Sequence, residues 1–132
     1  MKIAVDTNVL LRDALQDDPR QSPIASRTLQ RAKLVVVPTA VLCEFVWVMR
    51  RLYKRSSPEI ALSIRLLMNG GNVEMNRPAI EAGLEVLDQD GDFADGVIAY
   101  EGSWHGAQEF VSFDKQAVSL LKSQGKRARL LT

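Results

Sequence analysis

Residues 3–8 have the sequence IAVDTN, a short apolar run that ends in an aspartate and continues as threonine and asparagine. A β-branched run of this length predicts a buried strand, and Asp-Thr-Asn predicts a turn or helix cap directly after it. Ligands of open parallel sheets bind outside the carboxyl ends of the strands. We therefore expect Asp6 to stand where such a fold carries out its chemistry.

Outside this stretch, apolar runs alternate with helical patterns. The sequence FVSFD at residues 110–114 repeats the opening pattern, since an apolar run again ends in an aspartate. Alternation of strands and helices favours crossover connections and parallel pairing. We predict a three-layer α/β/α fold with a central, mostly parallel sheet, and a single domain over residues 1–132. Strands are expected at about residues 2–6, 34–37, 73–75, 110–113 and 128–131, and helices at about 7–15, 22–33, 39–53, 57–69, 77–88, 93–105 and 115–123.

Two helix starts carry specific cap predictions. Thr7 or Asn8 is a candidate cap for the first helix. Ser22 is predicted to cap the second helix, with Pro23 in its first turn.

The composition is that of an ordinary globular protein. Hydrophobic residues make up 46% and charged residues 25% of 132 residues, and the formal net charge is +1. Bulk charge therefore favours neither a nucleic acid nor a membrane, and a nucleic-acid partner would need local patches. A single cysteine, Cys43, excludes an internal disulfide and fits a reducing compartment. No apolar stretch is long enough to span a membrane, so we expect a soluble, cytoplasmic protein without a membrane partner.

Glu44 is the second candidate functional residue. It lies in VLCEFVWVM, residues 41–49, where apolar side chains surround it on both sides. If buried, this carboxylate must be protonated, paired with a cation or bound to a metal. The alternative is that Glu44 lies on a narrow polar stripe of an amphipathic helix.

Further aspartates occur at two predicted helix starts. Asp92 and Asp95 are three residues apart in DFADGVIA, which places them on one side of a helix start. Asp92 can serve as a cap there and Asp95 can favour the helix dipole. Asp114 likewise can cap the helix that starts at residue 115. The structural roles and the functional roles of these acids stay open at this point.

Taken together, the acids predict a metal site more strongly than any one of them does. Three or four carboxylates without His or Cys ligands select Mg²⁺ or Mn²⁺ over zinc. Such sites commonly serve phosphoryl-transfer chemistry, where the ion orients water and neutralises charge on phosphate. The candidate carboxylates are Asp6, Glu44, Asp95 and Asp114.

Four short motifs in this order resemble the PIN-domain family, and specifically the VapC-type toxins of bacterial toxin–antitoxin pairs. VDTNVL at residues 5–10 resembles the Asp-Thr-Asn opening, and Glu44 lies in a long helix as the family's glutamate does. DFADGVIA at residues 92–99 is similar to the Ala-Asp motif, with Asp95 on its ligand position. VSFD at residues 111–114 is similar to the closing motif. Gly96 stands where the family usually has alanine, Ser112 where it more often has threonine, and Ala117 where it often has an aromatic residue.

The resemblance implies a PIN-like fold and a metal-dependent endoribonuclease. It implies that Asp6, Glu44 and Asp95 hold Mg²⁺ or Mn²⁺ and that Asp114 supports the site directly or through water. Asp92 is a candidate for a second ion or for orienting water. Thr7, Asn8 and Ser112 are candidates for positioning the acids or the RNA substrate. The implied partners are a cognate antitoxin, a second copy in a homodimer, and operator DNA contacted only through the antitoxin.

Basic and aromatic residues give a further, ambiguous signal. Arg50, Arg51, Lys54 and Arg55 cluster at the end of one predicted helix, where they can contact RNA phosphates or simply favour the helix dipole. Trp47 can stack on an RNA base, pack in the core or belong to a dimer surface.

Other functions compete with the toxin nuclease. One is a PIN nuclease with a housekeeping role in RNA maturation. Another is a catalytically silent α/β binding protein whose acids only cap helices. A phosphatase or a response-regulator receiver also places aspartate at strand ends, but Asn8 stands where the phosphatase needs a second Asp, and Asp6 lacks the adjacent acids of a receiver.

Overall fold

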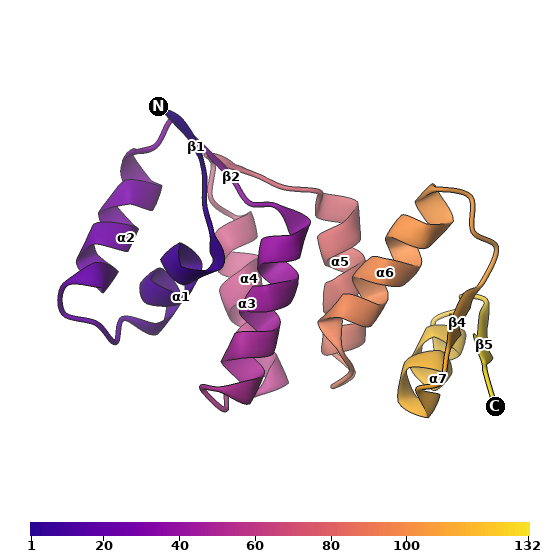
Figure 1. The fold of residues 1–132 in the computed structure, drawn as a ribbon. Helices are drawn as coiled ribbons and strands as arrows, with labels where there is room; N and C mark the ends of the chain where they lie inside the picture. The colour runs from indigo at the N-terminus through magenta and orange to yellow at the C-terminus, as the bar shows by residue number, and fades with distance from the viewer. The chain divides into compact units, whose positions relative to one another are not determined.

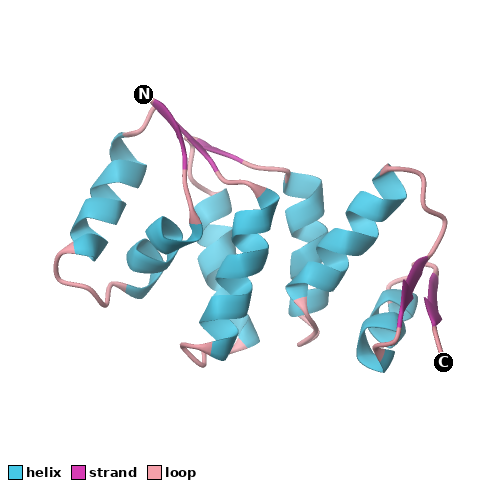
Figure 2. Ribbon diagram, viewed as in Figure 1, coloured by secondary structure: helices cyan, strands magenta, loops and turns pink.

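The computed structural model describes all 132 residues and divides into two compact units, Met1–Asn76 and Arg77–Thr132. Each unit contains helices and parallel strands (Figures 1 and 2).

The sheet of the first unit has three parallel strands in the order β1-β2-β3. Ile3 pairs with Val35, and Val35 in turn pairs with Val73. The side chain of Val35 is fully buried, as expected for the middle strand of a covered parallel sheet. The strands are β1 (Lys2–Ala4), β2 (Leu34–Val36) and β3 (Val73–Glu74).

Four helices complete the first unit. Helix α1 packs against α2 and α3, and α3 packs against α4 (Figure 1). Helix α4 begins with a full capping box, in which Ser56 and Glu59 satisfy each other's backbone N–H groups. The helices are α1 (Thr7–Leu15), α2 (Gln21–Arg31), α3 (Thr39–Arg51) and α4 (Ser57–Met68).

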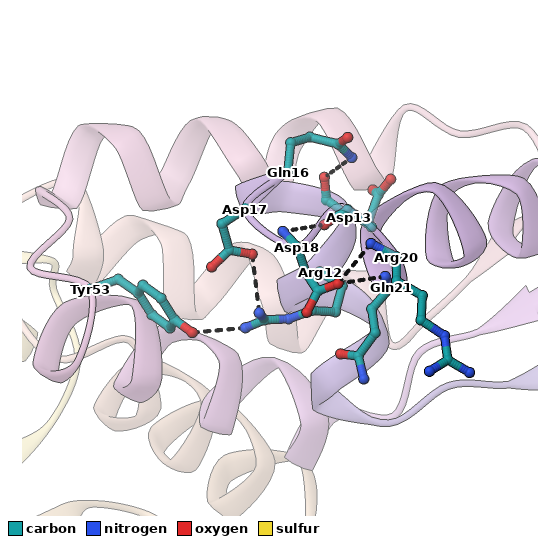
Figure 3. A network of polar contacts seen from close by, with 9 residues as sticks. Arg12, Asp13, Gln16, Asp17, Asp18, Arg20, Gln21 and Tyr53 are labelled. Atoms are coloured by element: carbon teal, nitrogen blue, oxygen red, sulfur yellow. Dashed lines mark hydrogen bonds and ion pairs between the residues drawn. The ribbon is translucent and has the colours of Figure 1, made fainter.

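A polar network fastens the end of α1 to the turn after α3 (Figure 3). The guanidinium of Arg12 donates to the hydroxyl of Tyr53 at 2.7 Å and to the carboxylate of Asp17 at 3.0 Å. The bond to Tyr53 is the largest cause of a raised pKa of Arg12. Because α1 follows Asp6 and α3 carries Glu44, this network joins the two helices that present the first unit's candidate acids.

Tyr53→Phe is expected to lower the free energy of unfolding by about 1 kcal/mol, because a part-buried hydrogen bond to a charged group is lost while the ring stays. Asp17→Asn serves as the comparison, and its effect is expected to be smaller, since Asp17 is exposed and the pair is screened. Urea unfolding of the two variants measures which substitution lowers the free energy of unfolding more. A larger loss from Asp17→Asn would contradict the role assigned to Tyr53.

The second unit contains three helices and a two-stranded parallel sheet. Helix α7 packs on both strands, and Val86, Val118, Leu121 and Ala128 form a buried core. Within the sheet Phe110 pairs with Ala128. The elements are α5 (Arg77–Leu87), α6 (Phe93–Trp104), β4 (Phe110–Ser112), α7 (Lys115–Ser123) and β5 (Ala128–Leu130).

Helices α5 and α6 approach each other unusually closely at Gly96. A Cβ atom at Gly96 would lie 2.2 Å from the carbonyl oxygen of Ala82, so no larger residue fits without moving backbone. On the facing helix, a Cβ at Gly83 would lie 2.6 Å from the ring of Phe93. This contact fixes the first turn of α6, which carries Asp95.

The predicted elements are all present, but two cap predictions were wrong. Asp6 caps α1, where Thr7 or Asn8 was expected. Ser22 lies inside α2 and is buried, and its hydroxyl accepts from the backbone N–H of Asp18. Asp18 itself accepts from the N–H groups of Arg20 and Gln21. Helices long and apolar enough to cross a membrane are absent from the structure.

Candidate active site: two sets of carboxylates

Asp6 lies two residues beyond the end of β1 and caps α1. Its carboxylate accepts a hydrogen bond from the backbone N–H of Val9 at 3.3 Å, and its side chain is exposed. Thr7, the next residue, is buried, whereas Asn8 is exposed. The junction of strand and helix therefore holds one carboxylate at the surface of the first unit.

Glu44 lies on the exposed face of α3, so the alternative of a polar stripe is correct and the premise of a buried carboxylate was wrong. Trp47 and Arg51 are exposed on the same helix, at spacings of three and four residues. Residues at these spacings share one helix face. Leu42, Phe45 and Met49 point instead into the core of the unit.

The second unit places two further acids, Asp92 and Asp114, near Asp95. Asp92 caps α6 and accepts from the N–H of Ala94 at 3.2 Å. Asp114 caps α7 and accepts from the N–H groups of Gln116 at 2.9 Å and Ala117 at 3.2 Å. The hydroxyl of Ser112 accepts from the backbone N–H of Asp114 at 2.9 Å, so Ser112 helps to fix this turn.

Asp95 is the electrostatically perturbed member of this group. Burial, which is the largest cause, and the negative charges of Asp92 and Asp114 together raise the pKa of its carboxyl to about 6. A cation close to Asp95 would reduce this repulsion among the carboxylates. The sequence alone predicts the three acids but not this asymmetry among them.

Asp92→Asn is expected to lower the pKa of Asp95 toward its ordinary value, because one of the two repelling charges is removed. Asparagine is also a good helix cap, so α6 should keep its start. A titration of the side-chain carboxyl signals by NMR checks this shift. Glu81→Gln removes an exposed charge of α5 as a control, and an equal shift there would contradict a local effect of Asp92.

The structure itself does not assemble a metal site. Neither unit arranges three or more His, Cys, Asp or Glu side chains so that they could hold an ion. A pocket of about 450 Å³ in the second unit lies elsewhere, and Ile98, Tyr100, Phe110 and Lys126 are among its lining residues. The acids fit a hard divalent cation by their chemistry, since all are oxygen donors.

The comparisons with known proteins identify the family. The PIN domain family model matches residues 3–120, a range that includes every candidate acid. A comparison with curated proteins finds no match. The match confirms the predicted fold class, a PIN-like α/β/α fold with parallel strands. Since it covers most of the sequence, the chain belongs to the PIN-domain family, whose members are generally nucleases and typically use divalent metal ions.

Proposed function

We propose that this chain is a metal-dependent endoribonuclease of the VapC type, the toxin of a toxin–antitoxin pair. The observation that carries the proposal is the half-buried Asp95, whose pKa of about 6 results from burial and from two neighbouring carboxylates. Membership of a family of nucleases supports the choice of reaction. The resemblance of its four motifs to VapC toxins supports the biological role.

The proposed ligands of Mg²⁺ or Mn²⁺ are Asp6, Glu44, Asp95 and Asp114. Asp92 is proposed to hold a second ion or to orient water. Thr7, Asn8 and Ser112 are proposed to position the acids or the RNA, and the bond from the N–H of Asp114 to Ser112 is consistent with this. When bound, the ion would neutralise charge at the scissile phosphate and make water a stronger nucleophile.

The chain's own residues have two tasks in this reaction. The carboxylates must be deprotonated to bind a cation, and Asp95 completes its ionisation only above about pH 6. The caps hold the acids in place, because Asp6, Asp92 and Asp114 each accept backbone N–H groups with a carboxylate oxygen. We therefore expect metal affinity to rise with pH through this range.

The same caps are the specific observation that favours a silent binding protein. An acid that caps a helix has a structural role whether or not it binds a metal. The two functions differ in their prediction for RNA, since only the nuclease cleaves it. A housekeeping PIN nuclease would also cleave RNA, and a gene for a small DNA-binding antitoxin beside this one would favour the toxin.

Cleavage of a structured RNA mixture tests the proposed function. The purified chain is incubated with Mg²⁺, Mn²⁺ or EDTA beside Asp6→Asn, which keeps a capping side chain at α1 but removes the charge. Glu81→Gln is the control. We expect cleavage that needs the metal, is lost in Asp6→Asn and survives in Glu81→Gln. Metal-dependent cleavage that persists in Asp6→Asn would exclude Asp6 from the site, and no cleavage by the wild type would favour the binding protein.

The proposed partners follow from the resemblance alone. A cognate antitoxin would inhibit the nuclease, a homodimer would be its assembly, and operator DNA would be contacted only through the antitoxin. Co-expression with the product of a neighbouring small gene, followed by sedimentation, tests these assignments. We expect the product to form a stable complex with this chain and to relieve the growth inhibition that expression of the chain alone causes. A monomeric chain that does not bind the product would contradict these assignments.

A further inference from the structure

One face of α3 is exposed along most of the helix. Its members are Ala40, Glu44, Trp47 and Arg51, at successive spacings of four, three and four residues. At about 1.5 Å of rise per residue, Trp47 lies roughly one turn beyond Glu44 and Arg51 roughly one turn beyond Trp47. Along this face a proposed metal ligand, Glu44, is followed by an aromatic ring and then by a cation.

Trp47 and Arg51 form a cation–π pair on this face. The guanidinium carbon of Arg51 lies 5.9 Å from the centroid of the Trp47 ring, and 56% of Trp47 is exposed. An exposed indole beside a cation offers a flat apolar surface on which a planar group of another molecule can stack. The contact with the Arg51 guanidinium favours one orientation of the indole, which lowers the entropy lost when a planar group stacks on it.

Some of the other cations near the end of α3 hold the fold together, and others are exposed to solvent. Arg50 donates to the hydroxyl of Ser57 at 2.5 Å and so ties α3 to the start of α4. Arg55 pairs with Glu59 at 3.3 Å, but both partners stay exposed. Lys54 is exposed and has a positive φ of 54°, in the turn directly after α3. Arg51 and Lys54 therefore give this end of the face a positive charge, although the whole chain has a net charge of only +1.

We propose that this face of α3, defined by Glu44, Trp47 and Arg51, binds single-stranded RNA. A base stacks on Trp47, and the adjoining phosphates lie near Arg51 and Lys54. Exposed aromatic rings beside cations bind single strands in this way, because every base offers a π-face and every linkage a negative charge. The proposal rests on the proposed function and adds to it the path of the substrate strand away from Glu44.

A protein partner fits the same surface less well. Covering Trp47 with an apolar protein face would also bury the charge of Arg51, which is costly unless an acid pairs with it. An RNA strand supplies the stacking surface and the anion together. Self-association through Trp47 is the competing outcome that the experiment must separate.

Binding of a short oligouridylate in EDTA, where no metal-dependent cleavage occurs, tests the proposal. In a Trp104→Phe variant Trp47 is the only tryptophan and reports contact through its fluorescence; Trp104 is 72% exposed and lies in the second unit. We expect the oligonucleotide to quench this emission.

Trp47→Leu is expected to weaken binding of a labelled strand about five- to 150-fold, the range for loss of one base–aromatic stack. Arg51→Gln is expected to weaken binding and to reduce its salt dependence, whereas Arg27→Gln, which removes an exposed cation of α2, should have little effect.

Three results would overturn the inference. Unchanged RNA affinity and unchanged KM for cleavage in Trp47→Leu would exclude Trp47 from the substrate path while leaving the nuclease intact. Loss of a dimer in Trp47→Leu with unchanged RNA affinity, seen by sedimentation, would assign the face to a second copy. A wild type that neither binds nor cleaves RNA would refute the proposed function and the inference with it.

Discussion

Asp95→Asn should abolish metal-dependent RNA cleavage and, at the same time, stabilise the fold above about pH 6. Cleavage should fall at least about a hundredfold, the loss that follows removal of one preorganised electrostatic contact. Stability should rise because the native structure raises the pKa of Asp95 from 3.8 to about 6, so its charged form is disfavoured there. Asparagine keeps the shape of the side chain without the charge.

The pH dependence of this effect has a definite sign. Below pH 3.8 Asp95 is protonated in both the folded and the unfolded state, so the substitution should change little. Between pH 3.8 and about 6 the folded state binds more protons, so wild-type stability falls as pH rises. Above about pH 6 Asp95 is ionised in both the folded and the unfolded state, and the full difference in unfolding free energy between Asp95→Asn and the wild type remains. We expect about 1 kcal/mol, because solvent screens a half-buried carboxylate.

Denaturant unfolding in EDTA across this pH range measures the stability, and RNA cleavage measures the activity. Glu101→Gln, an exposed acid on the same helix, is the matched control and should change neither. A variant at Asp95 that loses stability at every pH would show a structural role for the carboxylate. A variant that still cleaves RNA would remove Asp95 from the site.

Gly96→Ala is the second substitution for which we expect a large effect. The added methyl group would meet the carbonyl oxygen of Ala82 at 2.2 Å and the Cα of Gly83 at 2.9 Å. Both are backbone atoms, so relief requires α6 to move away from α5. Overpacking of this kind costs about 1–3 kcal/mol and sometimes more. Because Asp95 precedes Gly96, the displacement should also reduce cleavage.

Gly102→Ala on the same helix provides the control. A Cβ atom there would meet only the Cβ of Ala107, at an ordinary distance of 3.7 Å. Removing a helical glycine then stabilises the chain by roughly 0.5–1 kcal/mol. Thermal unfolding of both variants measures the contrast. Equal effects at the two positions would show that the close contact at Gly96 does not limit the packing of these helices.

The order of strands and helices was predictable because local sequence patterns determine it. Short β-branched runs alternate with helical periodicity, and the proline and glycine positions mark the breaks. The caps were harder, because neighbouring polar residues compete for the same N–H groups. Asp6 takes the cap predicted for Thr7 or Asn8, and Ser22 lies within its helix.

The candidate acids were predictable as residues but not in their environments. The apolar sequence around Glu44 predicts a costly burial of its carboxylate, yet Leu42, Phe45 and Met49 face inward and Glu44 faces solvent. Its spacing to Trp47 and Arg51 was enough to predict a shared face. The need for glycine at position 96 depends on the closeness of α5, which is tertiary information that the sequence does not carry locally.

Calorimetric titration of Mn²⁺ into the RNA-free chain at neutral pH tests the central claim, that these carboxylates bind a divalent cation, most directly. We expect binding by the wild type and by Glu81→Gln. In Asp6→Asn and in Asp95→Asn the affinity should fall by more than the roughly 10- to 100-fold cost of losing an outer-shell partner. Wild-type affinity in either acid variant, or no binding by the wild type, would contradict the account.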